Sequence, residues 1–325
     1  MTTIVANAKA QVSESIATRA ARLIVRACLK PALRPAVPIS LQRKWVGFAT
    51  RTLLVPRGVR FEPALLQGVP AERIVRRLGQ PAPGKAVLFL HGGAYIVGSP
   101  RTHRSITGRL AGLTGVATYV PDYRLAPEHP FPAALEDALA CYRALLAVGY
   151  RAADLVVSGD SAGGGLALAL LLALRERGIA QPAGLALISP WVDLTCTQLA
   201  SIRDDALLSE PWLRQGAAAY LSARSPRHPF ASPLNGDLAG LPSVVIQSAG
   251  EEILRTDSRR LADALRAAGG KVELDEHPRL WHDFQLYAGI VPEATEALRK
   301  MAAVVSQWLA LDAHHAPPTH SRERN

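Results

Sequence analysis

The stretch VVSGDSAGGGLAL at residues 156–168 is the part of the sequence that most directly indicates the fold. An apolar, β-branched run leads into glycines, and an Ala- and Leu-rich run follows, which predicts a buried strand turning abruptly into a helix. Residues 159–163 (GDSAG) fit G-x-S-x-G, in which a serine stands on a strained strand-to-helix turn. The sequence therefore predicts Ser161 as a nucleophile, against the alternative of an ordinary helix-capping serine.

Outside this stretch, short β-rich runs alternate with helical ones from about residue 72. This alternation predicts an α/β fold with a mostly parallel sheet and helices on both faces. Catalytic residues are then expected on loops at the carboxyl ends of the strands. The predicted strands are 73–78, 86–90, 117–120, 155–158, 184–188, 244–248 and 271–276, and the predicted helices are 133–148, 162–177, 258–268 and 293–311.

The ends of the chain and one internal stretch depart from this alternation. In residues 1–50, Ile16, Ala20, Leu23 and Ala27 fall on one face of a predicted helix, with arginines largely on the other, so this segment is expected to form a helical cap. Residues 51–312 are the expected catalytic domain, and its insertion at about 191–230 is a second expected part of the cap. Residues 313–325 are polar and rich in Pro and His, and we expect a disordered tail.

Composition excludes some functional classes and favours a globular enzyme. The 325 residues are 49% hydrophobic and 20% charged, enough for one large core. The net charge of +10 is spread along the chain, which favours a solvated basic surface over a nucleic-acid-binding or anionic-membrane-binding surface. The three cysteines match no metal or disulfide spacing, the N-terminus is a poor secretory signal, and no run is long enough to span a membrane. A cytoplasmic location is expected.

A serine nucleophile needs backbone donors and a base, and both are available in the sequence. At residues 91–95 (HGGAY) an apolar strand ends in small residues, whose N–H groups can approach a developing negative charge. His282 follows the last predicted strand and is the expected base, with His277 as its rival. Three carboxylates after the preceding strand, Glu251, Glu252 and Asp257, compete to orient it. The order serine, acid, histidine is that of α/β-hydrolases.

Together these motifs resemble the hormone-sensitive-lipase-like bacterial (family IV) esterases of the α/β-hydrolase superfamily. The resemblance spans residues 72–310 and rests on HGGAY at 91–95, PDYRLAPEHPFPA at 121–133, GDSAGG at 159–164, SPWVD at 189–193 and HDF at 282–284. It implies an α/β-hydrolase fold with a helical cap. The segment at 121–133 is then expected to brace the loops near the site.

The resemblance also assigns roles to individual residues. Ser161 matches the nucleophile and His282 the base, and alignment on Leu254 places the acid on Glu252, with Asp257 as the alternative. Gly93, Ala94 and Ala162 match the backbone donors of the oxyanion hole, and Gly92 shapes its turn. The family pattern HGGG has become HGGA here, and alanine tolerates positive φ poorly. Tyr95, Trp191 and Trp212 are candidate pocket walls.

The predicted function is a serine carboxylesterase that hydrolyses small uncharged esters with short to medium acyl chains through an acyl-enzyme. This chemistry requires no metal or cofactor, and no nucleic-acid partner is expected. The alternatives are a lactone hydrolase with the same residues and an inactive ligand-binding scaffold of this fold. Oligomeric state stays open, although the strand at 271–276 could pair in a homodimer.

Overall fold

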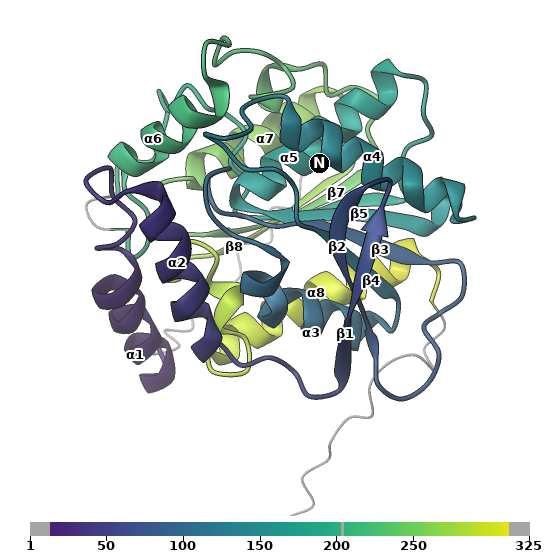
Figure 1. Ribbon diagram of the computed structural model, residues 1–325, viewed down its shortest axis with the longest axis horizontal. Coiled ribbons are helices and arrows are strands. Elements are labelled where there is room, and N and C mark those ends of the chain that lie inside the picture. Colours follow the sequence, from purple (N-terminus) through teal and green to yellow (C-terminus); the bar gives the residue numbers. More distant parts are fainter. Residues whose placement is uncertain (1–13, 203–204, 312–325) are drawn as a thin grey trace, which may run out of the picture.

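An eight-stranded sheet lies at the centre of the computed structural model, which describes residues 14–202 and 205–311 (Figure 1). Its spatial order is β1-β2-β4-β3-β5-β6-β7-β8. The β1–β2 and β2–β4 pairs are antiparallel and the other five pairs are parallel, so the predicted α/β class with a mostly parallel sheet is confirmed. The strands are β1 (Val59–Leu66), β2 (Val69–Arg76), β3 (Ala86–Leu90), β4 (Ala117–Pro121), β5 (Leu155–Asp160), β6 (Gly184–Ile188), β7 (Ser243–Ala249) and β8 (Val272–His277).

Helices cover both faces of the sheet, with α3 and α8 below it and α4, α5 and α7 above it in Figure 1. The central strands explain this arrangement, because both of their faces are buried. In β3, Leu88 and Leu90 join one hydrophobic cluster, whereas Val87 and Phe89 join the other. The helices are α1 (Ile16–Ile24), α2 (Ile39–Ala49), α3 (Arg104–Thr114), α4 (Ala133–Ala147), α5 (Ser161–Glu176), α6 (Glu210–Leu221), α7 (Arg255–Ala267) and α8 (Pro292–Trp308).

Several elements differ from the sequence prediction. Strand β1 and helices α3 and α6 were not predicted, although α6 lies in the expected insertion, and β2 begins at Val69 rather than at residue 73. Strand β1 contains Glu62 and Pro63, which are rare in central strands but acceptable here because β1 is an edge of the sheet. Helix α3 contains Gly108 and Gly112, two poor helix formers that weaken its pattern.

The N-terminal helices lie at the left edge of the molecule in Figure 1, below α6. Helix α1 continues into a π-helical turn at Val25–Leu29 before α2 begins. The predicted apolar stripe on α1 is present but faces solvent, since Ile16 and Leu23 are 85% and 63% exposed. Arg22 points inward instead, where it pairs with Glu251 and bonds the carbonyl of Arg279.

Two sequence predictions fall partly or wholly outside the described residues: the tail at 313–325 and the start of the N-terminal segment, residues 1–13. Over the described ranges, no helix is both long enough and apolar enough to cross a bilayer. Within the same ranges, the side chains of His, Cys, Asp and Glu form no group of three that could hold a metal ion.

Candidate active site

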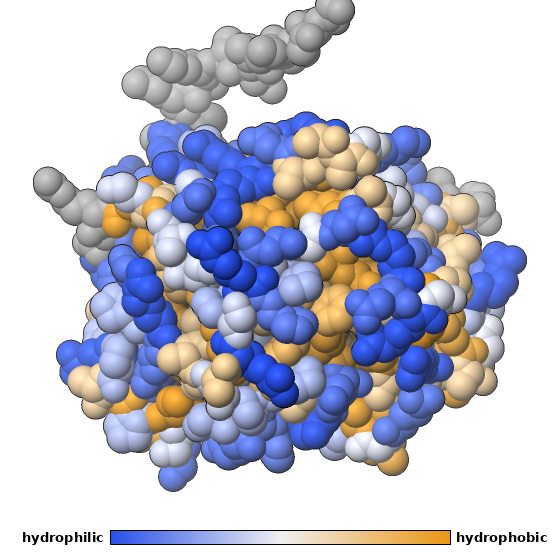
Figure 2. Space-filling view, turned by 90° about the horizontal axis from the view of Figure 1, so that it is seen from above, coloured by the Kyte–Doolittle hydropathy of each residue, from blue (hydrophilic) through white to orange (hydrophobic). Residues whose placement is uncertain are grey.

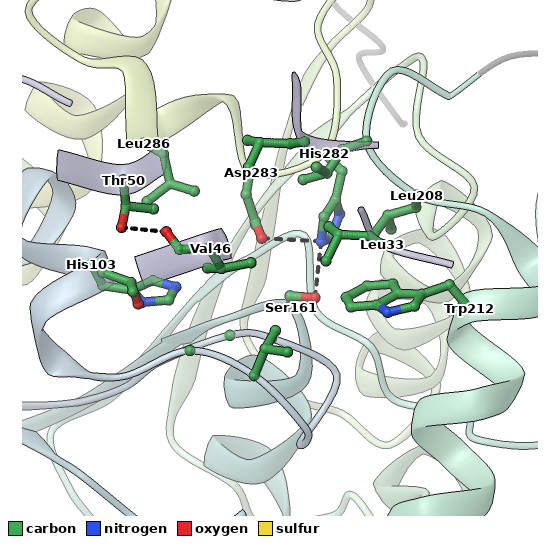
Figure 3. A pocket seen from close by; sticks show the side chains of 17 residues that line it. Leu33, Val46, Thr50, His103, Ser161, Leu208, Trp212, His282, Asp283 and Leu286 are labelled. Carbon is green, nitrogen blue, oxygen red and sulfur yellow. Dashed lines mark hydrogen bonds and ion pairs between the residues drawn. The ribbon is translucent and has the colours of Figure 1, made fainter. Parts of the chain in front are cut away.

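Ser161 lies at the turn between β5 and α5, with its side chain facing a pocket (Figure 3). Its φ is +52°, a left-handed conformation that costs on the order of 1–3 kcal/mol in a non-glycine residue. Gly163 is required for the same turn, because a Cβ there would stand 2.1 Å from the carbonyl oxygen of Leu90. The turn has the strained geometry that the G-x-S-x-G pattern predicts.

His282 reaches Ser161 from the loop after β8. Its Nε2 lies 2.9 Å from the Ser161 hydroxyl oxygen (Figure 3). Its Nδ1 lies 2.6 Å from Oε2 of Glu252. All three side chains are buried. The rival histidine, His277, instead contacts Asp275 at 3.2 Å. The arrangement therefore joins a hydroxyl, an imidazole and a carboxylate in one line of hydrogen bonds.

The sequence left three carboxylates open as partners of His282. Of these, Glu252 is the one that contacts it. Its Oε1 accepts hydrogen bonds from the Ser248 hydroxyl at 3.0 Å and the Ala249 N–H at 2.9 Å, which fix the other oxygen toward the imidazole. Asp257 accepts two backbone N–H bonds from residues 192 and 193 at 3.0 Å. Glu251 pairs with Arg22.

The loop after β3 carries the expected oxyanion donors. The N–H of Gly92 donates to Oδ1 of Asp160 at 3.0 Å, so this residue shapes the turn rather than facing the pocket with a free donor. The N–H groups of Gly93 and Ala94 have no acceptor among the described residues. Ala162 lies in the first turn of α5, where N–H groups lack intrahelical partners.

Alanine at position 94 adopts a φ of +51°, as the change from HGGG to HGGA implied. Its methyl group packs against α6 at Gly216, where a Cβ would stand 2.9 Å from the Ala94 Cβ and 2.8 Å from the Ala94 carbonyl oxygen. A glycine on α6 thus makes room for the alanine in the loop.

The segment at residues 121–133 holds the same loop in place. The Tyr123 hydroxyl donates to the carbonyl of His91 at 2.6 Å, and the Ala126 N–H donates to the carbonyl of Tyr95 at 2.9 Å. Helix α2 adds a further contact, because Arg43 donates to the carbonyl of Ile96 at 2.7 Å. These bonds fix both ends of the turn that carries Gly93 and Ala94.

Asp283 is a site residue that sequence reasoning missed. Its Oδ2 lies 3.0 Å from His282 Nε2, the nitrogen that also contacts Ser161 (Figure 3). Burial, with Asp160 nearby, raises the pKa of Asp283 to about 6 although His282 opposes this. Burial lowers the pKa of His282, but the carboxylates of Asp283 and Glu252 outweigh it and raise that pKa well above its ordinary value.

A second buried pair of titratable side chains, which the sequence analysis also missed, lies next to the loop after β3. We call this loop, which carries Gly93 and Ala94, the oxyanion loop. His103 Nε2 lies 3.1 Å from Oδ2 of Asp160, the residue before the nucleophile. Burial disfavours the charged imidazole, but Asp160 raises the pKa of His103 overall. Asp160 belongs to the GDSAG motif, so its position could have suggested a role, whereas nothing near His103 in the sequence indicated one.

The pocket in front of Ser161 is lined mainly by apolar side chains from the N-terminal segment and the stretch before α6. Trp212, one of the candidate walls, lines it, and its indole N–H donates to Gln42 at 2.7 Å. Tyr95 and Trp191 do not line it. Both are buried, and the Tyr95 ring stacks on Tyr220. The lining residues are Leu29, Leu33, Val46, Thr50, Gly92, Gly93, Val97, Gly98, Thr102, His103, Ser161, Leu207, Leu208, Trp212, His282, Asp283 and Leu286.

Comparison with known proteins shows which family the chain is similar to. A family model described as alpha/beta hydrolase fold matches residues 87–286. An acetyl-hydrolase of Streptomyces hygroscopicus is 44% identical over 68% of this chain and 75% of its own length. An esterase of Acinetobacter venetianus is 39% identical over 75% of this chain and 81% of its own. A crystal structure of an esterase from the bacterial hormone-sensitive lipase family superposes with a TM-score of 0.86 at 34% identity, covering 91% of this chain and 99% of that one.

The fold and the site define a carboxylic ester hydrolase of the α/β-hydrolase superfamily. Within that superfamily, the chain belongs to the hormone-sensitive-lipase family of esterases.

Proposed function

We propose that this esterase hydrolyses small uncharged esters with short to medium acyl chains, using Ser161 as nucleophile, His282 as general base and Glu252 as the orienting acid. The observation that carries the proposal is the unbroken line of contacts from Ser161 through His282 to Glu252, at 2.9 and 2.6 Å. A serine hydroxyl becomes an effective nucleophile only when a base is held within hydrogen-bond reach.

In the proposed reaction, Nε2 of His282 takes the Ser161 proton as the oxygen attacks the ester carbonyl. The imidazolium then protonates the leaving alcohol, and water hydrolyses the acyl-enzyme by the same route. Glu252 accepts a hydrogen bond from Nδ1, which fixes the tautomer and stabilises the positive charge. The N–H groups of Gly93, Ala94 and Ala162 bind the oxyanion, and loss of one such donor typically costs about 2.7–4 kcal/mol.

The pocket supports this proposed substrate class. Its walls are apolar, so they favour an uncharged acyl or alcohol group. The Asp283 carboxyl beside His282 would repel a substrate carboxylate or phosphate at pH values above about 6. The name of the Streptomyces relative, an acetyl-hydrolase, supports a preference for short acyl groups.

We further propose that residues 1–50 and about 191–230 act as the cap, with residues 51–312 as the catalytic domain. Leu33 and Val46 from the first segment and Trp212 from the second line the pocket opposite the oxyanion loop. Substitutions at these positions should therefore change the KM for longer acyl chains more than the kcat for acetate esters.

The proposal is tested by measuring hydrolysis of p-nitrophenyl esters from acetate to laurate, together with simple γ- and δ-lactones. We expect the highest kcat/KM for acyl chains of two to about six carbons, and a loss of at least about 10⁴-fold in Ser161→Ala, since catalysis by subtilisin-type sites falls by about 10⁶ when the serine is removed. A strong preference for lactones would assign the alternative substrate. If the wild-type protein hydrolysed none of these esters and lactones, the inactive ligand-binding scaffold would be the remaining interpretation.

We propose a homodimer in which the β8 strands of two subunits pair. Strand β8 lies at one end of the sheet, and one side of its backbone has no neighbouring strand among the described residues. Pairing of two β8 strands would extend the sheet across both subunits. Light scattering over a range of protein concentrations should give twice the 34.7 kDa chain mass, and a monomer at all concentrations would refute it.

A further inference from the structure

The N-terminal segment exposes apolar side chains to an extent that the rest of the described surface does not. Eight of the twelve exposed large apolar side chains in the described ranges lie between positions 16 and 55. Three of them lie on α1, three on α2 (Leu41, Trp45 and Phe48) and two in the chain just after α2. The Trp45 indole N–H donates to the carbonyl of Cys28 at 2.7 Å, which ties α2 to the π-helical turn that follows α1. We refer to the exposed side chains of residues 16–55 as the N-terminal face.

The same segment is basic and has no acidic residue. Residues 16–55 contain eight Lys and Arg and no Asp or Glu, which is a local concentration of charge in a chain whose net charge is +10. Several of these cations are exposed, and in the described part of the chain no carboxylate pairs with Arg34, Lys44 or Arg51. Apolar residues mixed with polar ones, as on the face shown in Figure 2, need no explanation. A concentration of exposed apolar side chains beside Arg34, Lys44 and Arg51 does need one.

We propose that the N-terminal face docks on the surface of an anionic phospholipid bilayer. Helices that lie in a membrane interface combine apolar side chains, which enter the boundary between headgroups and acyl chains, with Lys and Arg that bind lipid phosphates. Trp45 has the amphipathic ring that favours the headgroup level. The docking requires no membrane span.

Charge complementarity favours this partner over the others that could cover the face. A second copy of the chain would bring the same cations against each other. Residues 1–13 contain Lys9 and no acidic residue, so they offer no opposite charge. A nucleic acid would satisfy the cations but would leave most of the aliphatic side chains in water.

The position of the face gives the docking a consequence for the enzyme. Val46 on α2 and Thr50, directly after that helix, line the pocket, while Trp45 and Phe48 on α2 are exposed. Docking therefore places the wall of the pocket against the lipid, where apolar esters concentrate. The docking itself does not depend on the proposed catalytic roles.

The experiment is co-sedimentation of the full chain with vesicles of phosphatidylglycerol and phosphatidylcholine, compared with phosphatidylcholine alone. We expect binding to the anionic vesicles that weakens as salt is added, with a blue shift of Trp45 emission that is absent in Trp45→Phe. Replacing Lys44→Gln and Arg51→Gln together should lower partitioning by more than about tenfold, since each basic residue near such a surface contributes roughly fivefold. Leu41→Ser with Phe48→Ser should also weaken binding.

Leu78→Ser with Val148→Ser is the matched control, because these side chains are 87% and 71% exposed and lie outside the face. The control should bind vesicles as the wild type does, and all variants should hydrolyse p-nitrophenyl acetate at wild-type rates. The proposal is overturned by any of four results: no vesicle binding, equal loss in the control, binding only after deletion of residues 1–13, or a dimer that the Leu41/Phe48 variant abolishes. Salt-sensitive binding to DNA without binding to vesicles would point to a nucleic acid instead.

Discussion

Asp283 places a second carboxylate beside His282, the proposed base. Its Oδ2 and the Ser161 hydroxyl both contact Nε2 of this histidine. Asp283 lies 3.0 Å from the same His282 nitrogen that accepts the Ser161 proton in the proposed reaction. When ionised, it stabilises the imidazolium and so opposes the neutral form that starts catalysis. Its backbone is left-handed, at φ +53°, a conformation that Asp and Asn tolerate better than most residues. We therefore expect Asp283 to influence the pH range in which the enzyme is active.

We predict that Asp283→Asn extends activity to lower pH. His282 must be unprotonated to act, so activity is present above its pKa and lost as the pH falls through it. Asp283 is among the groups that raise this pKa, with Asp160, His103 and Glu252 also facing the cluster. Removing its charge should shift the acid limb of kcat/KM down by roughly one to three pH units. An unchanged acid limb, with a normally folded variant, would show that Asp283 does not act on His282.

At the scale of elements, the oxyanion loop and α6 are matched to each other. Ala94 adopts positive φ and places its methyl group against Gly216. The N-terminal helix is likewise attached to the catalytic loops, because Arg22 pairs with Glu251, bonds the Arg279 carbonyl and lies 5.5 Å from the Trp281 ring centre. Those loops carry Glu252 and His282, so α1 and the site share one set of contacts.

Gly216→Ala should displace the loop that carries Ala94 and lower kcat/KM for p-nitrophenyl acetate by about tenfold or more. Small displacements of groups that position a substrate reduce the rate by this order. Adding Ala94→Gly should recover part of the loss, because one of the two close contacts disappears. The control is Gly58→Ala, where a Cβ would meet nothing within 4 Å. Purely additive losses in the double variant would mean that the two positions are not coupled.

Arg22→Met should loosen α1 while leaving the charges on Glu252 and His282 in place. We expect faster proteolysis within residues 25–38 and a decrease in the free energy of unfolding of about 1 kcal/mol, because the ion pair with Glu251 is partly exposed. Limited proteolysis and urea unfolding measure both effects. Wild-type protease resistance would show that Arg22 does not hold the helix.

At the scale of the whole molecule, the sequence predicted the parts of the fold that obey simple periodicity. The parallel strands around the site were predicted to within two residues at their ends, because β3, β5, β6 and β7 are apolar on both faces. Strand β1 was missed because an edge strand tolerates Glu and Pro, and α3 because its glycines weaken the helical pattern. Periodicity detected the apolar stripe of α1 but could not say which way it faces. That depends on contacts of Arg22 more than 200 residues away.

Some residues of the candidate site could also be predicted from the sequence, and others could not. Ser161 and His282 could be predicted because motif and chain order constrain them, and the choice among the three acidic residues needed the family resemblance. Asp283 belongs to the HDF motif, but its contact with Nε2 of His282 depends on the conformation of the loop, and the place of His103 depends on long-range packing, which no local pattern encodes. Tyr95 and Trp191 illustrate the converse, since large aromatics near a site in the sequence can belong to the core.

The measurement that tests the central account most directly is kcat/KM for p-nitrophenyl acetate in Glu252→Gln beside Asp257→Asn. Glu252 contacts His282, whereas Asp257 bonds only backbone N–H groups 192 and 193 and pairs weakly with Arg260 at 3.9 Å. Loss of the orienting acid in a serine–histidine–acid site lowers turnover by about 10⁴-fold. The account predicts a loss of roughly 10²–10⁴-fold in Glu252→Gln and less than about tenfold in a folded Asp257→Asn. The reverse pattern, with Glu252→Gln nearly as active as the wild type, would contradict it.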